Sequence, residues 1–262
     1  MTQFDQLAEE VRKAGAFAKA QQQHLTSSLK KDGSIVTNAD LEISHSLIKT
    51  IGRLYPGAGR ISEEEDCPKG EDGEITFVLD PIDGTDVYSQ GLPGFAVALG
   101  ILDANHRPVG AIIDAPRFGA GEDELFITMR PGEKPLINGR PLVLAAGKDD
   151  VIQVTMSSTA FRRFGFSNFK GKARIFGSTI IHMLAPAVFP GIQAGMAFSC
   201  YLWDVAAAHA VLKGVGMDIV YADGTELMYD DRLLAKGQIS KAIYAGTKPG
   251  RDYLRTHLPQ LV

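Results

Sequence analysis

Residues 80–85, with the sequence DPIDGT, decide how this chain of 262 residues is read. They follow the apolar run of residues 76–79, which predicts a short buried strand that ends at Asp80. In α/β proteins the carboxyl ends of strands tend to hold the site. Asp80, Asp83 and the Ile82 carbonyl would bring three hard oxygen ligands to that end, and oxygen is the donor that Mg²⁺ prefers.

The residues that follow this turn predict a phosphate site. Gly84 and Thr85 open a predicted helix, residues 85–90, whose free backbone amides favour an anion. Asp-Pro and Asp-Gly are each ordinary turn dipeptides. The whole hexapeptide, however, is expected by chance in only about one in 10⁴ chains of this length, from average residue frequencies. The hexapeptide therefore indicates function rather than a mere turn.

The chain before the hexapeptide predicts two helices. Residues 4–18 carry apolar positions at helical spacing, and Thr2 begins that helix with an approximate capping box. A second amphipathic helix follows Thr37 and stops at Pro56. The mostly polar residues 29–37 predict a turn-like link between the two helices.

The chain after the hexapeptide predicts two kinds of organisation. An antiparallel run of strands comes first, at residues 95–102, 109–113 and 124–128, with a hairpin turn at Asn138-Gly139. Strands and helices then alternate, with strands at 151–156, 173–176, 196–202 and 241–244 and helices at 178–185 and 204–213. This alternation predicts a layered α/β architecture.

We divide the chain into two parts on this pattern. The N-terminal α+β part, residues 1–148, carries most of the candidate metal ligands. The C-terminal α/β part, residues 149–262, completes the site. The polar residues 147–150 are the predicted boundary.

Charge is unevenly spread along the chain. The 31 acidic and 27 basic residues give a net charge of −4. Residues 61–83 hold nine carboxylates and one lysine, so the other 22 acidic and 26 basic residues leave the rest of the chain at +4. A hydrophobic share of 45% excludes a disordered chain. Because a nucleic-acid binder is expected to carry a basic excess, the overall balance predicts no nucleic-acid partner.

The cysteines, the first ten residues and the interrupted uncharged residues 175–203 together predict a cytoplasmic protein without a membrane partner. Cys67 and Cys200 alone make neither a disulfide framework nor a zinc site, which favours a reducing compartment. Three carboxylates within the first ten residues are unlike an export signal. Residues 175–203 lack Asp, Glu, Lys and Arg, but prolines and glycines interrupt them, so we expect buried helix, turn and strand there.

The hexapeptide resembles the signature of the inositol monophosphatase-like family of Mg²⁺-dependent, lithium-sensitive phosphatases. Histidinol-phosphate, phosphoadenosine-phosphate and fructose-1,6-bisphosphate phosphatases belong to the same superfamily. Three further motifs follow the family's order: G-x-x-V-T-x-A-D at residues 33–40, (G/S)-E-E at 62–64 and W-D-x-A-A at 203–207. The resemblance covers nearly the whole chain. It implies an alternating α-β-α-β-α sandwich and a homodimer.

The resemblance also implies a role for each matching residue. It implies two or three Mg²⁺ ions on a ligand set of Glu63, Asp80, the Ile82 carbonyl, Asp83 and Asp204. It implies that the substrate is bound by Asp83, Gly84, Thr85, Ser178 and Thr179. The implied catalytic residues are Asp40, Thr85 and Glu63, with Asp40 and the Thr85 hydroxyl acting on the attacking water. Asp204 has the alternative role of capping a helix.

We therefore expect the hydrolysis of a small phosphomonoester by metal-activated water. Inositol-specific members place a glutamate seven residues before the aspartate of W-D, where this chain has Ala197, which argues against inositol phosphate. His209 resembles the phosphoadenosine-phosphate branch, although a satisfied core histidine is the alternative. A 3'-phosphoadenosine 5'-phosphate phosphatase, a histidinol-phosphate phosphatase and a non-catalytic metal-binding member stay open.

Overall fold

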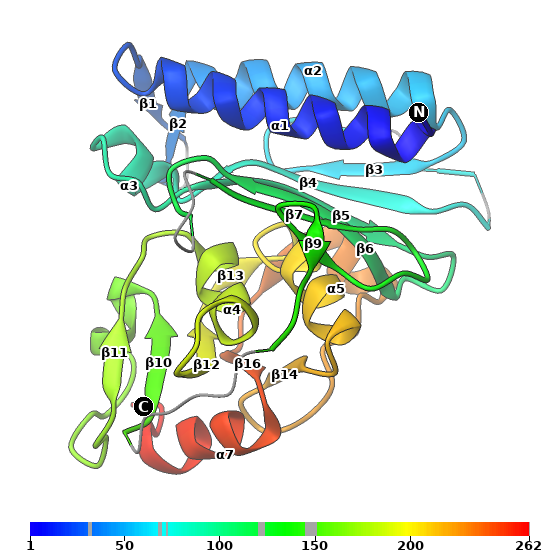
Figure 1. Ribbon diagram of the computed structural model, residues 1–262. Coiled ribbons are helices and arrows are strands. Elements are labelled where there is room, and N and C mark those ends of the chain that lie inside the picture. The colour runs from blue at the N-terminus through cyan, green and yellow to red at the C-terminus, as the bar shows by residue number, and fades with distance from the viewer. Residues whose placement is uncertain (31–32, 68–69, 72, 120–123, 145–150, 262) are drawn as a thin grey trace.

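Helices and sheets alternate in layers through the molecule, in the order α-β-α-β-α (Figure 1). The computed structural model describes residues 1–30, 33–67, 70–71, 73–119, 124–144 and 151–261. Hydrophobic clusters fill the spaces between the layers. This is the layered fold that the sequence predicts.

The first layer consists of α1 (Gln3–Gln21) and α2 (Asn38–Leu54). Each helix begins with a capping box, at Thr2 and at Thr37, in which the side chain and the backbone amide of the cap bond to an aspartate three residues on. The link between the helices is more ordered than predicted. It forms a hairpin of β1 (Ser27–Leu29) and β2 (Ile35–Thr37), because the β-branched residues of β2 favour an extended backbone.

The second layer is a sheet of seven strands in sequential order from β3 to β9. Its members are β3 (Gly59–Ser62), β4 (Thr76–Asp83), β5 (Ala96–Leu102), β6 (Pro108–Ala115), β7 (Leu125–Met129), β8 (Leu136–Ile137) and β9 (Arg140–Pro141). Only the pair of β3 and β4 is parallel among these strands. The predicted turn between β8 and β9 is confirmed, with positive φ at both Asn138 and Gly139. The short helix α3 (Thr85–Ser89) follows β4.

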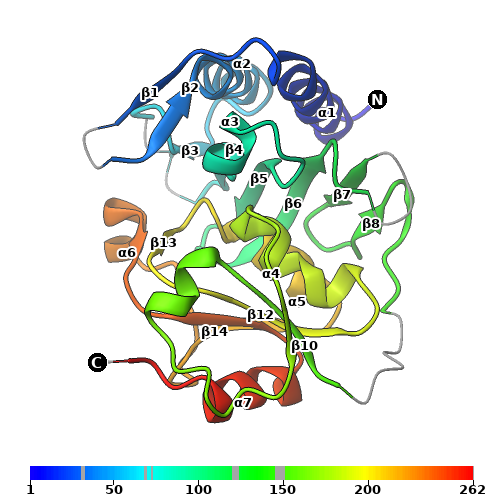
Figure 2. The same ribbon diagram turned by 90° about the vertical axis from the view of Figure 1, so that its left-hand side faces the viewer.

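The inner helices α4 (Thr179–Val188) and α5 (Ala206–Gly214) separate this sheet from a second one. The second sheet has the order β11-β10-β12-β16-β14. Its strands are β10 (Gln153–Met156), β11 (Lys172–Arg174), β12 (Ile192–Ala197), β14 (Asp218–Tyr221) and β16 (Ile243–Gly246). Helix α7 (Lys248–His257) lies on its outer face (Figure 2).

Smaller elements join these layers. The 3₁₀ helix η1 (Ser158–Arg162) connects β10 to the segment before β11, and β13 (Cys200–Tyr201) pairs with β15 (Gln238–Ile239). Helix α6 (Asp231–Lys236) precedes β15. Close packing holds α5 against the first sheet, since a Cβ at Gly100 of β5 would lie 2.8 Å from the Ala207 amide nitrogen.

Several predicted boundaries differ from the structure. The predicted strand 196–202 is split into β12 and β13, because the chain turns at Ser199, whose φ is 56°. The predicted helix 178–185 continues through Pro186, and the helix predicted from residue 204 begins at Ala206. The predicted strand 173–176 ends early, at Arg174.

Two predictions about the whole chain have different outcomes. The uncharged residues 175–203 form buried helix, turns and strands as predicted, and within the described ranges no helix combines the length and the apolar character needed to cross a membrane. The whole of the predicted boundary, residues 147–150, lies outside the described residues, so the division into two parts stays a prediction.

Candidate metal centre

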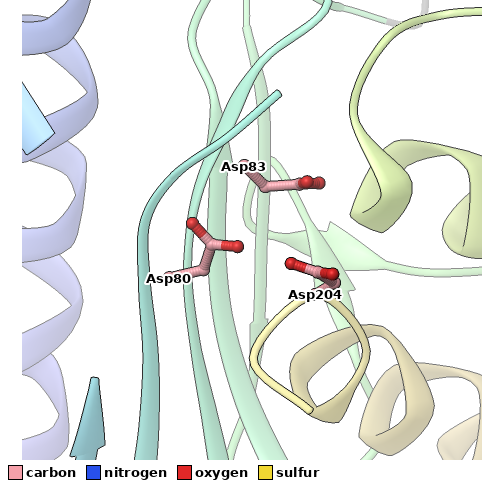
Figure 3. A group of neighbouring side chains, drawn as sticks. All are labelled: Asp80, Asp83 and Asp204. Carbon is pink, nitrogen blue, oxygen red and sulfur yellow. The ribbon is translucent and has the colours of Figure 1, made fainter. Parts of the chain in front are cut away.

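Three aspartates from distant parts of the chain meet at the carboxyl end of β4 (Figure 3). Asp80 and Asp83 belong to β4, and Asp204 lies in the turn that precedes α5. One carboxylate oxygen from each lies within 4.8 Å of the others. Each of these residues was predicted as a metal ligand, and the structure brings them together.

Asp80 has the most unfavourable environment of the three. Its side chain is fully buried. When it is ionised, neither carboxylate oxygen accepts a hydrogen bond from a donor among the described residues. A hydrogen bond forms only if Asp80 and Asp204 share a proton. Burial, together with the charges of Glu63, Asp83 and Asp204, raises the pKa of Asp80 well above its usual range. A buried carboxylate without a donor fits a bound cation, which would supply the missing partner.

Asp83 is oriented by hydrogen bonds from the start of α4. Its carboxylate accepts the Ser178 hydroxyl and the amides of Thr179 and Ile180, the last two at 3.2 and 2.6 Å. Burial raises the pKa of Asp83 to about 6, although these bonds favour the charged form. Ser178 also caps α4 by accepting the Ile181 amide at 3.0 Å. The predicted substrate residues Ser178 and Thr179 therefore lie directly against a candidate ligand.

Asp204 does not act as the helix cap that was its alternative role. The cap of α5 is Val205, which makes no side-chain bond, whereas Asp204 accepts the amide of Tyr201 at 2.7 Å. Burial and the charge of Asp83 raise the pKa of Asp204 well above the usual value. Its carboxylate is thus held toward β4 by the turn rather than by the helix.

Glu63, a further predicted ligand, is paired with a lysine that the sequence analysis did not single out. The Lys30 ammonium, carried by the β1–β2 hairpin, lies 2.7 Å from Glu63 and 2.5 Å from Glu64. Burial raises the pKa of Glu63 to about 7, and Lys30 opposes that shift. Burial disfavours the charged lysine, but the bonds and charges of the two glutamates still raise the pKa of Lys30. No sequence motif marks Lys30, because its role depends on tertiary contact alone.

The predicted catalytic pair also meets. The Thr85 hydroxyl lies 2.8 Å from the Ile82 carbonyl and 3.3 Å from Asp40, so its single proton serves two acceptors. The Ile82 carbonyl keeps a second lone pair, which leaves it able to bind a cation. Burial raises the pKa of Asp40 to about 6, against the bonds that it accepts from Thr37.

Gly84 lies next to Thr85 and packs closely against the N-terminus of α4. Its φ is +88°, and a Cβ there would lie 2.7 Å from the Gly94 carbonyl oxygen and 3.3 Å from the Ser178 nitrogen. Only glycine therefore suits this position, in conformation and in space. The close approach places the predicted phosphate-binding turn beside the N-terminus of α4.

The sequence as a whole matches a known family. Residues 2–248 match the inositol monophosphatase family. The chain belongs to this family.

Two relatives that match over most of their length carry different names. The inositol-1-monophosphatase of Mesorhizobium japonicum is 27% identical over 243 residues, covering 86% of this chain and 87% of that protein. The Nus factor SuhB of Vibrio cholerae is 26% identical over 243 residues, with the same coverage of 86% and 87%. The Nus factor SuhB of Pasteurella multocida is 34% identical over 153 residues, so that match spans only 54% of the relative.

Solved structures of the family share the fold. The IMPase of Thermotoga maritima superposes with a TM-score of 0.77 at 20% identity, covering 96% of this chain and 94% of that one. An IMPase/NADP phosphatase complexed with Mg²⁺ and phosphate superposes with a TM-score of 0.74 at 15% identity, covering 92% and 89%. The chain has the α/β fold of these IMPase structures.

Two positions that bear on the expected substrate are both buried. Ala197 ends β12 and is buried, so it offers no polar group to a substrate ring. His209 is also buried, and both ring nitrogens are engaged, at 3.2 Å from the Tyr229 hydroxyl and 2.7 Å from Asp218. His209 is therefore a satisfied core histidine.

Proposed function

We propose that this chain is a Mg²⁺-dependent phosphatase that hydrolyses a small phosphomonoester. The observation that carries the proposal is the fully buried Asp80, which has no donor among the described residues and lies against two further carboxylates. Family membership supports it, because the family consists largely of metal-dependent phosphomonoesterases.

The ligand set that we propose is Asp80, Asp83, Asp204, Glu63 and the Ile82 carbonyl, holding two or three ions. Mg²⁺ bound there would lower the pKa of a coordinated water and neutralise charge on the phosphate. Asp83 is held rigid by α4, which fixes its direction toward the site. Glu63 joins the set when Lys30 moves away from it, since one carboxylate oxygen now bonds the ammonium.

The remaining residues position the reacting groups. We propose that the amides of Gly84 and Thr85 bind the phosphate, with Ser178 and Thr179 beside them at the start of α4. Asp40 and the Thr85 hydroxyl would orient the attacking water and help to remove its proton. The hydroxyl already contacts both Asp40 and the Ile82 carbonyl, so one group links the candidate base to the ligand set.

The substrate and the setting of the enzyme are further parts of the proposal. Ala197 argues against an inositol ring, and His209, whose two ring nitrogens are already engaged by Tyr229 and Asp218, gives no special support to 3'-phosphoadenosine 5'-phosphate. Sugar and histidinol phosphates therefore belong in the first panel with nucleotide and inositol phosphates. We propose a cytoplasmic homodimer by family resemblance, with a non-catalytic metal-binding protein as the alternative.

The test is phosphate release from this panel with and without Mg²⁺. We expect release from at least one compound, its loss on adding a chelator, and its recovery with excess Mg²⁺. Glu42→Gln, an exposed change on α2, is the control and should leave the rate unchanged. Folded protein that releases no phosphate from any compound with Mg²⁺ present would favour the non-catalytic alternative.

A further inference from the structure

One long segment of the chain carries positive charge only. Residues 151–203 contain no Asp or Glu and five basic residues: Arg162, Arg163, Lys170, Lys172 and Arg174. Residues 61–83, by contrast, carry nine carboxylates and one lysine. The net charge of −4, on which we expected no nucleic-acid partner, therefore averages over two segments of opposite sign.

The five basic residues all lie in one segment at the edge of the second sheet, residues 157–174, here called the β10–β11 segment. The chain leaves β10, passes through η1 and returns as β11, which pairs with β10 alone and lies at the sheet edge (Figure 1). Aromatic contacts hold this segment together: Phe161 stacks on Phe166 with ring centroids 4.7 Å apart at 29°, and Phe166 contacts Phe169 edge-to-face at 6.0 Å. Arg162 and Arg163 lie between Phe161 and Phe166 in the sequence, and Lys170 and Lys172 follow Phe169.

Much of the β10–β11 segment is exposed. Phe161 is 54% exposed although its ring is held by Phe166 beneath it. Arg162, Arg163, Lys170 and Lys172 are exposed as well. Phe161 is therefore an exposed aromatic ring within a segment that also carries four exposed cations.

The cations of this surface have no acidic partners within the described part of the chain. None of the five forms an ion pair there; Arg163 lies 5.5 Å above the Phe198 ring, and Arg174 donates to Gln153 and to a backbone carbonyl. Their charge is thus available to an anionic partner.

We propose that Phe161, Arg162, Arg163, Lys170 and Lys172, here called the η1–β11 surface, bind single-stranded nucleic acid. The four cations would contact phosphates, and a base would stack on the exposed ring of Phe161. A single strand fits better than a duplex, because stacking on Phe161 needs an unpaired base. The proposal concerns a surface separate in sequence from the aspartates, and it is independent of the phosphatase proposal.

The test is fluorescence anisotropy of labelled oligouridylate and oligothymidylate of about 12 nucleotides, within the range of known single-strand sites. Four phosphate contacts predict a slope of log K against log salt of about −3, or roughly a 50-fold loss of affinity between about 50 and 200 mM. The double variant R162Q/R163Q should bind more weakly and have a slope smaller by about 1.4. Phe161→Ala should weaken binding by about 5-fold to 100-fold without changing the slope.

A matched control removes the same charge elsewhere. The double variant K49Q/R107Q lies on α2 and on the turn before β6, both exposed, and should bind like the wild type. Thermal unfolding should show all three variants folded. No binding by the wild type at low salt, or an equal loss in the control variant, would overturn the proposal. Binding to vesicles of anionic phosphatidylglycerol but to neither oligonucleotide would overturn it too.

Discussion

Asp80 and Asp83 are three residues apart on one strand, yet their carboxylates differ in the hydrogen-bond donors around them. Asp83 accepts three hydrogen bonds from the start of α4, whereas Asp80 accepts none from the described residues while it is ionised. Substituting each by asparagine therefore separates the binding of metal from the support of the fold.

We expect Asp80→Asn to abolish Mg²⁺-dependent turnover while leaving the metal-free protein at least as stable as the wild type. The change removes a buried carboxyl group that repels its neighbours when ionised, and the new amide NH₂ can donate to Asp204 in place of the shared proton. Asp83→Asn should abolish turnover and also cost roughly 1–3 kcal/mol, because its amide NH₂ would face donors of α4. Phosphate release and the free energy of unfolding measure the two effects. Full activity in either variant would contradict the ligand set.

Lys30 provides a second prediction at this scale. Because its ammonium bonds Glu63 and Glu64, it competes with any cation for Glu63. Lys30→Gln should lower the Mg²⁺ concentration for half-maximal activity several-fold, as expected for a partly exposed pair worth about 1 kcal/mol. Lys49→Gln, an exposed lysine on α2, is the control. An increased Mg²⁺ requirement in Lys30→Gln would show instead that Lys30 assists the site.

At the scale of elements, the contact between α1 and β6 includes a buried carboxyl group. Asp114 of β6 lies under α1 at Gly15, where an added Cβ would come within 1.8 Å of its carboxylate. Neither oxygen has a hydrogen-bond donor among the described residues. Burial, with the charge of Glu124, raises the pKa of Asp114 to about 8, against the opposing charges of Arg12 and Lys19.

The raised pKa of Asp114 makes stability depend on pH. Between its ordinary value of 3.8 and about 8, the folded state binds a proton that the unfolded state has released. The free energy of unfolding should therefore fall as pH rises through this window. Asp114→Asn should raise the Tm by several degrees above pH 8 and change it little near pH 4. Scanning calorimetry across pH checks this, and a wild-type-like pH dependence in the variant would contradict it.

At the scale of the whole molecule, the candidate centre joins the first sheet to the layer of inner helices. Asp80 and Asp83 end a strand of the first sheet, while Asp204 precedes α5, which packs between the sheets. A ligand that binds only the folded state stabilises it by about 2.7 kcal/mol at a hundredfold excess over its Kd. Mg²⁺ should therefore raise the Tm of the wild type and leave that of Asp204→Asn almost unchanged. A Tm insensitive to Mg²⁺ in the wild type would exclude a cation at this place.

The sequence predicts the layers and the closeness of Asp80 to Asp83 because those features depend on local signals, whereas the place of Asp204 beside them was predicted only by the resemblance to the family. The capping boxes at Thr2 and Thr37, the Asn138-Gly139 turn and the DPIDGT hexapeptide are each readable within a few residues. The break at Ser199 is not readable in this way, because pairing of β13 with β15 decides it. The ion pair of Lys30 and the burial of Asp114 could not be predicted from the sequence for the same reason, because both depend on residues far away along the chain.

The separation of the aspartates along the chain has a consequence for synthesis. When the ribosome has made β4, Asp80 and Asp83 have no partner from α4 or from the turn before α5, since those segments are 95 or more residues further on. The two carboxylates stay hydrated during that interval. Their repulsion arises only when the later segments dock and exclude water. The candidate ligand set is therefore complete only once residues 178–204 have been made and have docked, and a nascent chain that ends after β4 carries only part of it.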